Sequence, residues 1–295
     1  MLLGNEELNN GFRPGGRISF GTWLDACDNF GVEFNYLGLG RSSDRFSRTS
    51  DGSPILARPF FDAESGAQDS HLIAYPDLQQ GTFSCTSISD FQVAGVLVRQ
   101  AIARAPGYRI ELLAGYRFQQ LAEGLSIADT ASTAASTIQI VDQFHSQNDF
   151  HGGELGLATE WRQCRWSLET SLKLAFGNTH SRTAINGSTT IDAITYPGGL
   201  LALPSNMGVH SADQFSVIPE LGVTFGYDLT CRLRATAGYS LIYWGNVSRP
   251  GNQIDLEVSP SQFPPTTQTA DKPAFARHTS DFWAQGLHVG LDYRF

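Results

Sequence analysis

The chain has 295 residues and a net charge of −9, and it contains 30 Gly, 19 Phe, 9 Tyr and 5 Trp against only 17% charged residues. The negative charge disfavours nucleic acid as a partner, because binding to phosphate depends on Lys and Arg. No apolar run approaches the ~20 residues that a membrane-spanning helix needs, and the abundance of glycine and aromatic residues favours strands and turns.

Alternating apolar and polar side chains predict nine strands along the chain. Successive side chains of a strand point to opposite faces, so strict alternation indicates one apolar face and one polar face. Two of the clearest cases are 30–36 and 108–119. In chain order the nine predicted strands are 16–24, 30–36, 82–102, 108–119, 150–161, 165–176, 215–228, 232–243 and 286–295.

The last of these strands, 286–295, alternates without exception. One face carries only Leu287, Val289, Leu291, Tyr293 and Phe295. An aromatic residue at the extreme C-terminus would fray in water, whereas the interface girdle of a transmembrane β-barrel gives it a place. These residues are similar to the terminal signal that directs outer-membrane barrels to the barrel-assembly machinery, which we therefore expect as a partner. A soluble β-sandwich, whose last strand also alternates, is the alternative at this point.

Short turns and long segments connect the predicted strands in strict alternation. The turns lie at 25–29, 103–107, 162–164 and 228–230, and the long polar segments at about 40–80, 122–149, 179–214 and 247–282. In an up-and-down meander this pattern places all turns at one end, as in bacterial outer-membrane barrels with short periplasmic turns and long extracellular loops. The sequence therefore predicts a single all-β domain over 1–295: an antiparallel up-and-down transmembrane β-barrel, embedded in the lipid of the bacterial outer membrane.

Strand parity and the N-terminus both point to a missing beginning. Bacterial barrels have even strand numbers, and strand 16–24 should follow an outward strand, whereas residues 1–15 resemble an external loop. Residues 1–6 also lack the basic region and apolar stretch of a signal peptide. We expect an upstream segment to hold the signal peptide and the first strand, giving ten strands in the complete protein. In these 295 residues, the edges of 16–24 and 286–295 should then be unpaired.

Long ungapped segments resemble bacterial outer-membrane proteins of the beta barrel porin-7 family. The resemblance is strongest at 242–255 and 281–287, and it continues at 54–61, 113–118 and 176–180. It implies an outer-membrane barrel with a cleaved signal peptide and an early strand. It implies no reaction and no ligand.

The polar faces of the predicted strands carry nearly equal numbers of acids and bases. The set comprises Glu33, Arg109, Glu111, Arg117, Glu154, Glu160, Glu169, Lys173, Glu220, Arg232, Arg234, Asp292 and Arg294. Buried charges need partners, and a barrel near ten strands is close to the size that its own side chains fill, far below the ~16–18 strands of porins with an aqueous channel. We therefore expect a structural barrel whose lumen is largely filled by paired charges. A narrow passive pore lined by the same residues is the alternative.

A catalytic site is a weaker interpretation. Asp142, His145, Asp149 and His151 lie close together near the expected outer rim, where an acid and a histidine can activate water in a membrane hydrolase. Any solvated loop shows similar residues, so no enzyme is predicted. The histidines lack compact metal-ligand spacing, and no cofactor is expected. Adhesion or ligand reception through the surface loops is a further alternative, and the oligomeric state stays open.

Cysteines and tryptophans add two expectations. Cys27, Cys164 and Cys231 lie at predicted periplasmic turns and Cys85 lies in a strand, so a disulfide between two turns is possible in that oxidising compartment. The aromatic side chains expected together in the outer interface girdle are Tyr243, Trp244 and Trp283.

Overall fold

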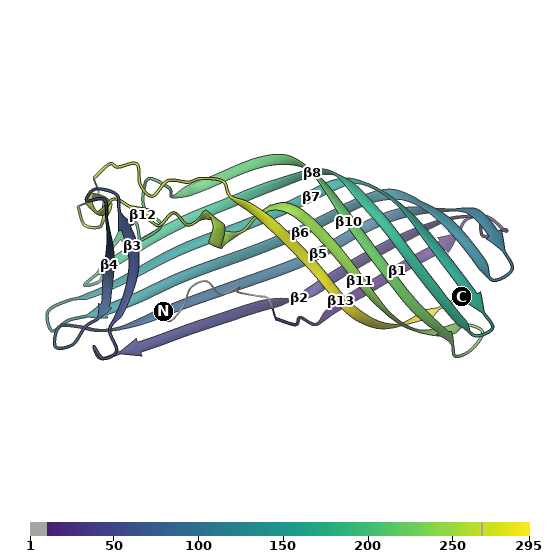
Figure 1. The fold of residues 1–295 in the computed structure, drawn as a ribbon, viewed down its shortest axis with the longest axis horizontal. Helices are drawn as coiled ribbons and strands as arrows, with labels where there is room; N and C mark the ends of the chain where they lie inside the picture. The colour runs from purple at the N-terminus through teal and green to yellow at the C-terminus, as the bar shows by residue number, and fades with distance from the viewer. Residues whose placement is uncertain (1–10, 267) are drawn as a thin grey trace.

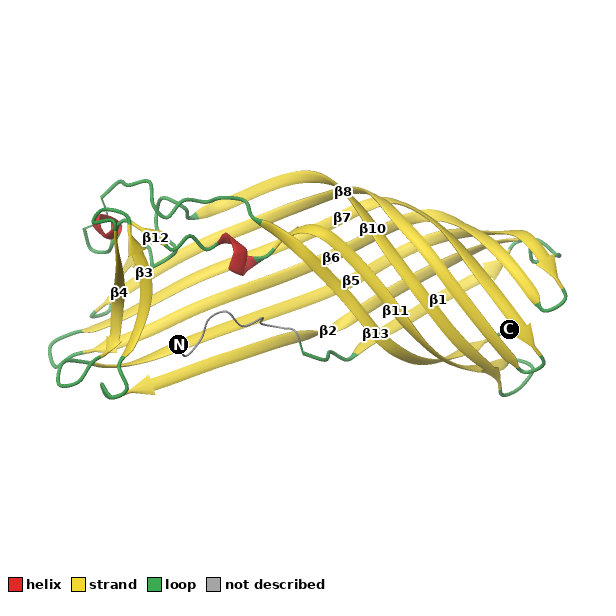
Figure 2. Ribbon diagram, in the orientation of Figure 1, coloured by secondary structure: helices red, strands yellow, loops and turns green. Residues whose placement is uncertain are grey.

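A computed structural model describes residues 11–266 and 268–295, and one large antiparallel sheet dominates it. In this part of the chain, nine long strands follow the order β1-β2-β5-β6-β7-β8-β10-β11-β13, and the short β9 pairs with β8. The sheet curls about its long axis into a barrel-like wall (Figures 1 and 2). The predicted all-β antiparallel meander is confirmed. The strand bounds are β1 Gly15–Trp23, β2 Phe30–Ser50, β5 Gln80–Ala105, β6 Tyr108–Ser132, β7 Thr137–Gln163, β8 Trp166–Ile191, β9 Ile194–Pro197, β10 Gly208–Asp228, β11 Leu233–Ser248 and β13 Thr279–Tyr293.

The convex face of the wall is apolar in the half nearest the short turns. On β6 the outward positions of this half run from Tyr108 to Phe118. Their counterparts on β13 are almost fully solvent-accessible, with Leu287 and Val289 each 87% exposed. We call this outward surface the apolar band. A surface of this size with so many exposed large apolar side chains is typical of a membrane-contacting wall.

Beyond the apolar band the hydrophobic phase of each strand inverts. On β6 the outward positions after Phe118 are Gln120 and Ala122, whereas the inward Leu121 and Leu125 are buried. On β7, Phe150 and Phe144 are likewise buried on the inner side. Apolar side chains therefore face outward in one half of the sheet and inward in the other, which is the arrangement expected where a wall passes from lipid into water.

Two of the predicted long loops are wrong, because the strands continue through them. Segment 122–149 is a hairpin of β6 and β7 whose connection is only Thr133–Ser136. Segment 179–214 holds the rest of β8, β9 and the start of β10. The 26 residues of β8 extend about 85 Å at ~3.3 Å per residue, whereas a membrane span needs ~9–11 residues. The phase inversion hides these continuations from a search for a single alternating pattern.

A small second sheet closes the end of the wall opposite the short turns. It consists of β3 Leu56–Asp62, β4 Ala67–Ala74 and β12 Glu257–Val258, with two short 3-10 turns at Pro250–Gln253 and Pro260–Gln262. Figure 1 shows it standing across that end of the large sheet. We call this sheet, together with segments 198–207 and 249–278, the cap. Its core contacts the inner wall through Phe60, Cys85, Phe144, Leu203 and Val258.

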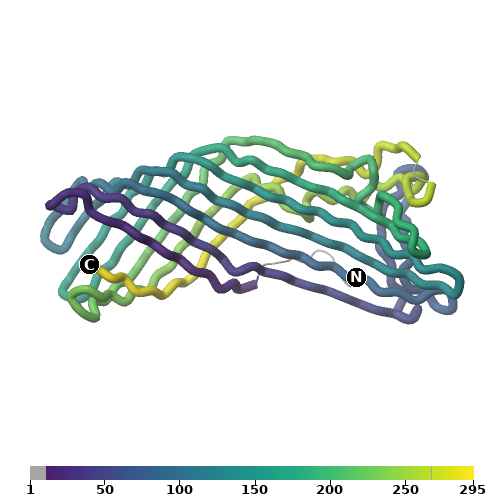
Figure 3. Tube along the Cα trace, turned by 180° about the vertical axis from the view of Figure 1, so that it is seen from behind, coloured from purple at the N-terminus to yellow at the C-terminus, as the bar shows by residue number. Residues whose placement is uncertain are grey.

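The two edge strands of the wall, β1 and β13, do not pair with each other in the described part of the chain. Because nine consecutive antiparallel strands alternate in direction, the first and the last run the same way. Figure 3 shows the trace from behind, with both strands reaching towards the end that carries the short turns. The expectation of unpaired edges at 16–24 and 286–295 is confirmed. No helix among the described residues has the length and apolar character required to cross a membrane.

Candidate functional site: the barrel interior

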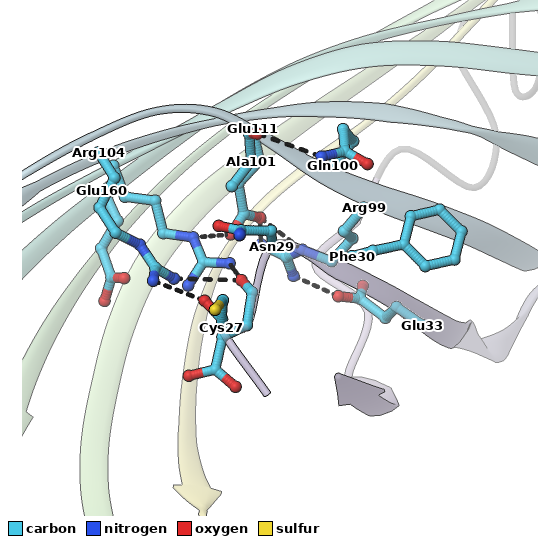
Figure 4. Close-up of polar contacts among 12 residues, drawn as sticks. Cys27, Asn29, Phe30, Glu33, Arg99, Gln100, Ala101, Arg104, Glu111 and Glu160 are labelled. Atoms are coloured by element: carbon cyan, nitrogen blue, oxygen red, sulfur yellow. Dashed lines mark hydrogen bonds and ion pairs between the residues drawn. The ribbon is translucent and has the colours of Figure 1, made fainter. Parts of the chain in front are cut away.

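A first group of charges lies inside the wall near the short turns. Arg99 contacts Glu33 and donates from Nε to Oε2 of Glu111 at 2.6 Å, and Glu111 also contacts Arg109. Figure 4 shows Arg99 between the two carboxylates, with Arg104 directed at the carbonyl oxygen of Cys27, 2.7 Å away. The group therefore links β2, β5 and β6 to the turn between β1 and β2.

A second group lies deeper and joins strands from opposite parts of the sheet. Arg117 is 1% exposed and donates from Nη1 to Oε2 of Glu220 at 2.7 Å and to Oε1 of Glu154 at 3.2 Å. Lys173 lies 3.5 Å from Glu220, and Arg17 on β1 reaches the same carboxylate at 3.7 Å. The contacts of Glu220 with Arg117 and Arg17 cross the lumen, whereas those of Arg117 with Glu154 and of Lys173 with Glu220 join neighbouring strands.

A third group lies at the short-turn end of β7, β10 and β11. Arg234 contacts Glu160 at 3.1 Å and Asp228 at 3.0 Å, and Arg162 donates to Glu160 at 2.6 Å. Most of the predicted lumen charges therefore lie in ion pairs. Four predicted members, Glu169, Arg232, Asp292 and Arg294, make no ion pair within the described residues.

Three cationic members of these groups were missed from the sequence: Arg17, Arg99 and Arg162. Arg99 had a usable signal, since it shares the inward phase of β5 with Leu97. Arg17 and Arg162 also alternate with outward residues, but they lie beside strand ends where the pattern is short. The identity of each partner, as in the pair of Arg117 with Glu220, depends on the curvature of the sheet and is invisible in the sequence.

An apolar cluster fills the lumen between these charges and the cap. Its largest members, Phe91, Phe150 and Trp244, are 0% exposed, and they come from β5, β7 and β11. The ring centroids of Phe91 and Phe282 are 4.9 Å apart, and the Trp244 indole Nε1 donates to Oγ1 of Thr179 at 3.3 Å. We call this cluster the apolar plug. Its buried members are Phe91, Val93, Leu121, Phe150, Ala175, Ile218, Ile242, Trp244, Val247 and Phe282.

The apolar plug overturns the prediction that Trp244 belongs to the interface girdle. Trp244 follows Tyr243 directly, so the two side chains must point to opposite faces of β11. Tyr243 does pack on Trp283 on the outer face, with ring centroids 5.1 Å apart. The expectation that paired charges largely fill the lumen was therefore incomplete, because apolar side chains occupy its middle.

The interior is open along the edges of β1 and β13, from the charged groups past Ile242 and Phe282 of the plug to Glu123 and Arg249. A cavity of about 2100 Å³ lies between the wall and the edges of β1 and β13. Glu33, Arg99, Lys173 and Glu220 line it together with apolar residues such as Leu113. The interior thus combines a charged, open chamber with an apolar constriction.

Ion pairs and amide contacts tie the cap to the inner wall. Arg58 on β3 is 6% exposed and donates to Asp129 at 2.7 Å and to Asp142 at 2.5 Å. The second oxygen of Asp142 accepts the backbone N–H groups of Leu200, Leu201 and Ala202 at 2.8–3.0 Å. Burial opposes the charge of Arg58, but the two carboxylates outweigh it and hold the pKa of Arg58 above its ordinary value.

The segment that follows β11 is held by a second set of contacts. Arg249 binds both carboxylate oxygens of Glu123, at 2.8 and 2.9 Å. The Asn148 amide pairs with the backbone of Ser248 in both directions, at 2.8 and 2.9 Å. Because these residues lie directly beyond the plug, they fix the start of segment 249–278 against the wall.

The four rim residues considered for catalysis do not share a face. Asp142 is fully buried inside and binds Arg58, whereas His145, Asp149 and His151 alternate with it and lie on the outer side of β7. The predicted loop around them is strand. No group of three or more His, Cys, Asp or Glu placed to hold a metal occurs in the described ranges.

The outer surface has the dimensions of a membrane wall. From Tyr108 to Phe118 the apolar band of β6 covers ten residue steps, about 33 Å along the strand at ~3.3 Å per residue. At a strand tilt of ~45° this is about 23 Å, close to the ~25 Å band of outer-membrane barrels. Aromatic pairs lie near the margin of the band that is closest to the short turns. The ring centroids are 5.8 Å apart for Tyr108 and Trp161 and 5.3 Å apart for Tyr293 and Phe295.

A comparison with protein families agrees with this geometry. Residues 1–295 match the family described as Putative beta barrel porin-7. The chain belongs to this family. No curated protein matches it. Membership in the beta barrel porin-7 family supports the outer-membrane, porin-like character of the chain and suggests that it is not an enzyme.

The segments that resemble the porin-7 family carry the contacts described above. Segment 54–61 contains Arg58 of the cap, and segment 242–255 contains Trp244 of the plug and Arg249. The expected terminal assembly signal also has a consistent placement, since Leu287, Val289, Leu291, Tyr293 and Phe295 are all exposed on the outer face. The signal itself stays a prediction.

Thiol labelling tests which end of the wall is accessible. Cys27, Cys164 and Cys231 are exposed free thiols near the short turns, whereas Cys85 is buried and burial raises the pKa of its thiol. In intact cells that export the protein, a membrane-impermeant maleimide should leave all four unmodified, and permeabilising the outer membrane should label three. Mass spectrometry of the peptides reports the sites. Labelling of Cys164 in intact cells would show that the short turns face the outside of the cell. A protein mass lower by two hydrogens would show that two of the cysteines form a disulfide.

Proposed function

We propose that the protein is a bacterial outer-membrane β-barrel with a structural role, and that the apolar plug and the adjoining ion pairs keep its lumen shut. The plug is the observation that supports this most directly. Side chains from β5, β7 and β11 meet in it without exposed surface, and a constriction of this kind excludes hydrated ions. The short turns would face the periplasm and the cap would face the exterior.

The complete wall, we propose, contains one more strand between β1 and β13. These edge strands run in the same direction, so a single additional strand can be antiparallel to both. Its addition also gives the even number usual in bacterial barrels. The unpaired edges of β1 and β13 support this proposal.

A narrow passive pore is the second candidate, and the charged chamber of about 2100 Å³ favours it. The cavity passes the plug only along the edges of β1 and β13, so once the proposed further strand covers these edges, opening such a pore would require displacement of the plug. A hydrolase has no such support, since the wall separates Asp142 from the other rim residues.

Planar-bilayer recording of the refolded, complete protein distinguishes the two candidates. A shut structural barrel should insert and give no steady conductance steps at moderate voltage. Insertion is verified independently by a heat-dependent shift in electrophoretic mobility. Reproducible steps of one size from the unaltered protein would instead establish the passive pore.

A further inference from the structure

A hollow of about 370 Å³ lies on the outer face of the wall, beyond the apolar band. Small side chains form its floor, namely Ala122 on β6 and Ala184 on β8. Gly124 lies beside them, and a Cβ there would come within 2.7 Å of Nδ1 of His145. Glycine at this position therefore lets the His145 ring lie flat against the wall.

Three basic side chains border this hollow. Arg41 comes from β2, and His145 and Arg182 come from β7 and β8. Arg41 lies in a bulge, where Gly40 and Arg41 together oppose the single residue Asp90, and such bulges redirect a side chain. The bases therefore come from β2 on one side of the hollow and from the adjacent strands β7 and β8 on the other, with β5 and β6 between them.

The two arginine side chains of the hollow are unpaired in the part of the chain that the structure describes. Neither the Arg41 nor the Arg182 side chain makes a hydrogen bond or ion pair with any residue that the structure describes. Asp90 is the acid on the outer rim of the hollow, while Glu123 in its lining is buried and bound to Arg249. The hollow therefore has an excess of positive charge, although the chain as a whole carries −9.

The polar side chains between the hollow and the apolar band already form hydrogen bonds with one another. Gln92 donates to Gln120 at 2.7 Å, and both Gln120 and Gln147 donate to Asp149 at 2.7 Å. These side chains form a polar row across β5, β6 and β7. The members of this row bind one another. The guanidinium groups of Arg41 and Arg182 therefore remain as hydrogen-bond donors for a ligand in the hollow.

The height of the hollow matches that of lipid headgroups. Ala122 lies two outward positions beyond Phe118, the last residue of the apolar band on β6. Four residues extend about 13 Å along a strand, or about 9 Å along the barrel axis at a ~45° tilt. The headgroup region begins directly outside the ~30 Å hydrocarbon core, so a lipid whose chains cover the apolar band brings its headgroup to this level.

We propose that this hollow binds the phosphorylated headgroup of an outer-leaflet lipid, with Arg41 and Arg182 donating to the phosphate oxygens and His145 closing one side. Arginine suits this role because its planar fork binds phosphate in a bidentate manner. The lipid chains hold the headgroup beside the wall, so the site needs little affinity of its own. The inference rests on the proposed location of the protein in a membrane.

Native mass spectrometry of the full chain in nonionic detergent tests the proposal. The probes are phosphatidic acid and diacylglycerol with the same acyl chains, so that only the phosphate differs. The chain should retain one phosphatidic acid saturably and should not retain diacylglycerol. The R41Q/R182Q variant should weaken retention by about tenfold or more, because it removes two charge-assisted contacts.

Arg45→Gln is the matched control, since Arg45 is an exposed arginine on the same strand that does not line the hollow. Its binding should stay within about twofold of the unaltered chain. Equal binding by R41Q/R182Q, or equal loss in R45Q, would overturn the proposal. Displacement of the lipid by an equal concentration of inorganic phosphate would also overturn it, by showing a site for free anions.

Flotation with phosphatidylcholine vesicles separates this inference from the proposed function. A chain that fails to float with the vesicles contradicts the membrane location itself. A chain that floats, yet binds phosphatidic acid and diacylglycerol equally, contradicts only the headgroup site.

Discussion

Alanine in place of both Phe150 and Trp244 should convert a non-conducting barrel into one with stable conductance steps. Both side chains are completely buried in the apolar plug, with ring centroids 6.4 Å apart. Their removal widens the passage between the charged chamber and the space beneath the cap. Water enters, because the side chains next to the cavity, such as Thr179 and Gln119, are polar and provide hydrogen bonds. Planar-bilayer recording measures the change.

Trp283→Ala is the matched control for this variant. Trp283 is a tryptophan at a similar level of the wall, but it is 60% exposed on the outer face, where its ring packs on Tyr243. The Trp283→Ala variant should give no conductance steps. Large-to-small core changes also cost about 3–5 kcal/mol each, so the heat-dependent mobility shift must confirm that the double variant is folded. A folded double variant without conductance would show that another part of the interior closes the lumen.

Arg58→Met should release the cap without unfolding the wall. The change preserves most of the side-chain volume but leaves the carboxylates of Asp129 and Asp142, both buried, without their common cation. Breaking such a pair by removing one partner costs about 3–5 kcal/mol. The small sheet buries only a few apolar residues, Leu56, Phe60, Ile73, Ala74 and Val258, so its attachment also depends on this contact.

Limited proteolysis measures the release. The turn between β3 and β4, 63–66, should be cut much faster in the Arg58→Met variant, whereas the hairpin of β6 and β7 keeps its resistance. Arg48→Met, which replaces an exposed arginine on β2, should change neither rate. Equal cleavage rates in the three proteins would contradict the role given to Arg58.

The half of the wall that carries the apolar band was predictable because one chemical contrast governs it. Outward apolar residues and inward polar or small residues alternate from Phe30 to Tyr36, from Tyr108 to Phe118 and along most of β13. The order of the strands then followed from the lengths of the connections. The inner charges were predictable for the same reason, since they occupy the polar phase.

The other half of the wall was not predictable from a single pattern. Beyond Phe118 the environment of the outer face changes, so Leu121 and Leu125 take the phase that polar residues held before. In the sequence, this change looks like the end of the alternating pattern followed by a loop. The plug escaped prediction for a related reason, because Phe150 and Trp244 lie at such phase changes and can be assigned to either face.

The height of the wall beyond the apolar band has a consequence for what the cell presents to its surroundings. From Phe118 to Ser132, fourteen residue steps extend about 46 Å along the strand and about 33 Å along the barrel axis. At the tip, the carboxylate of Asp192 accepts the Thr137 N–H at 2.8 Å and the Ser136 hydroxyl at 2.9 Å. In the proposed orientation this hairpin projects from the membrane and its tip is held by hydrogen bonds. An antibody epitope grafted at Ala134 would therefore be displayed far from the lipid surface.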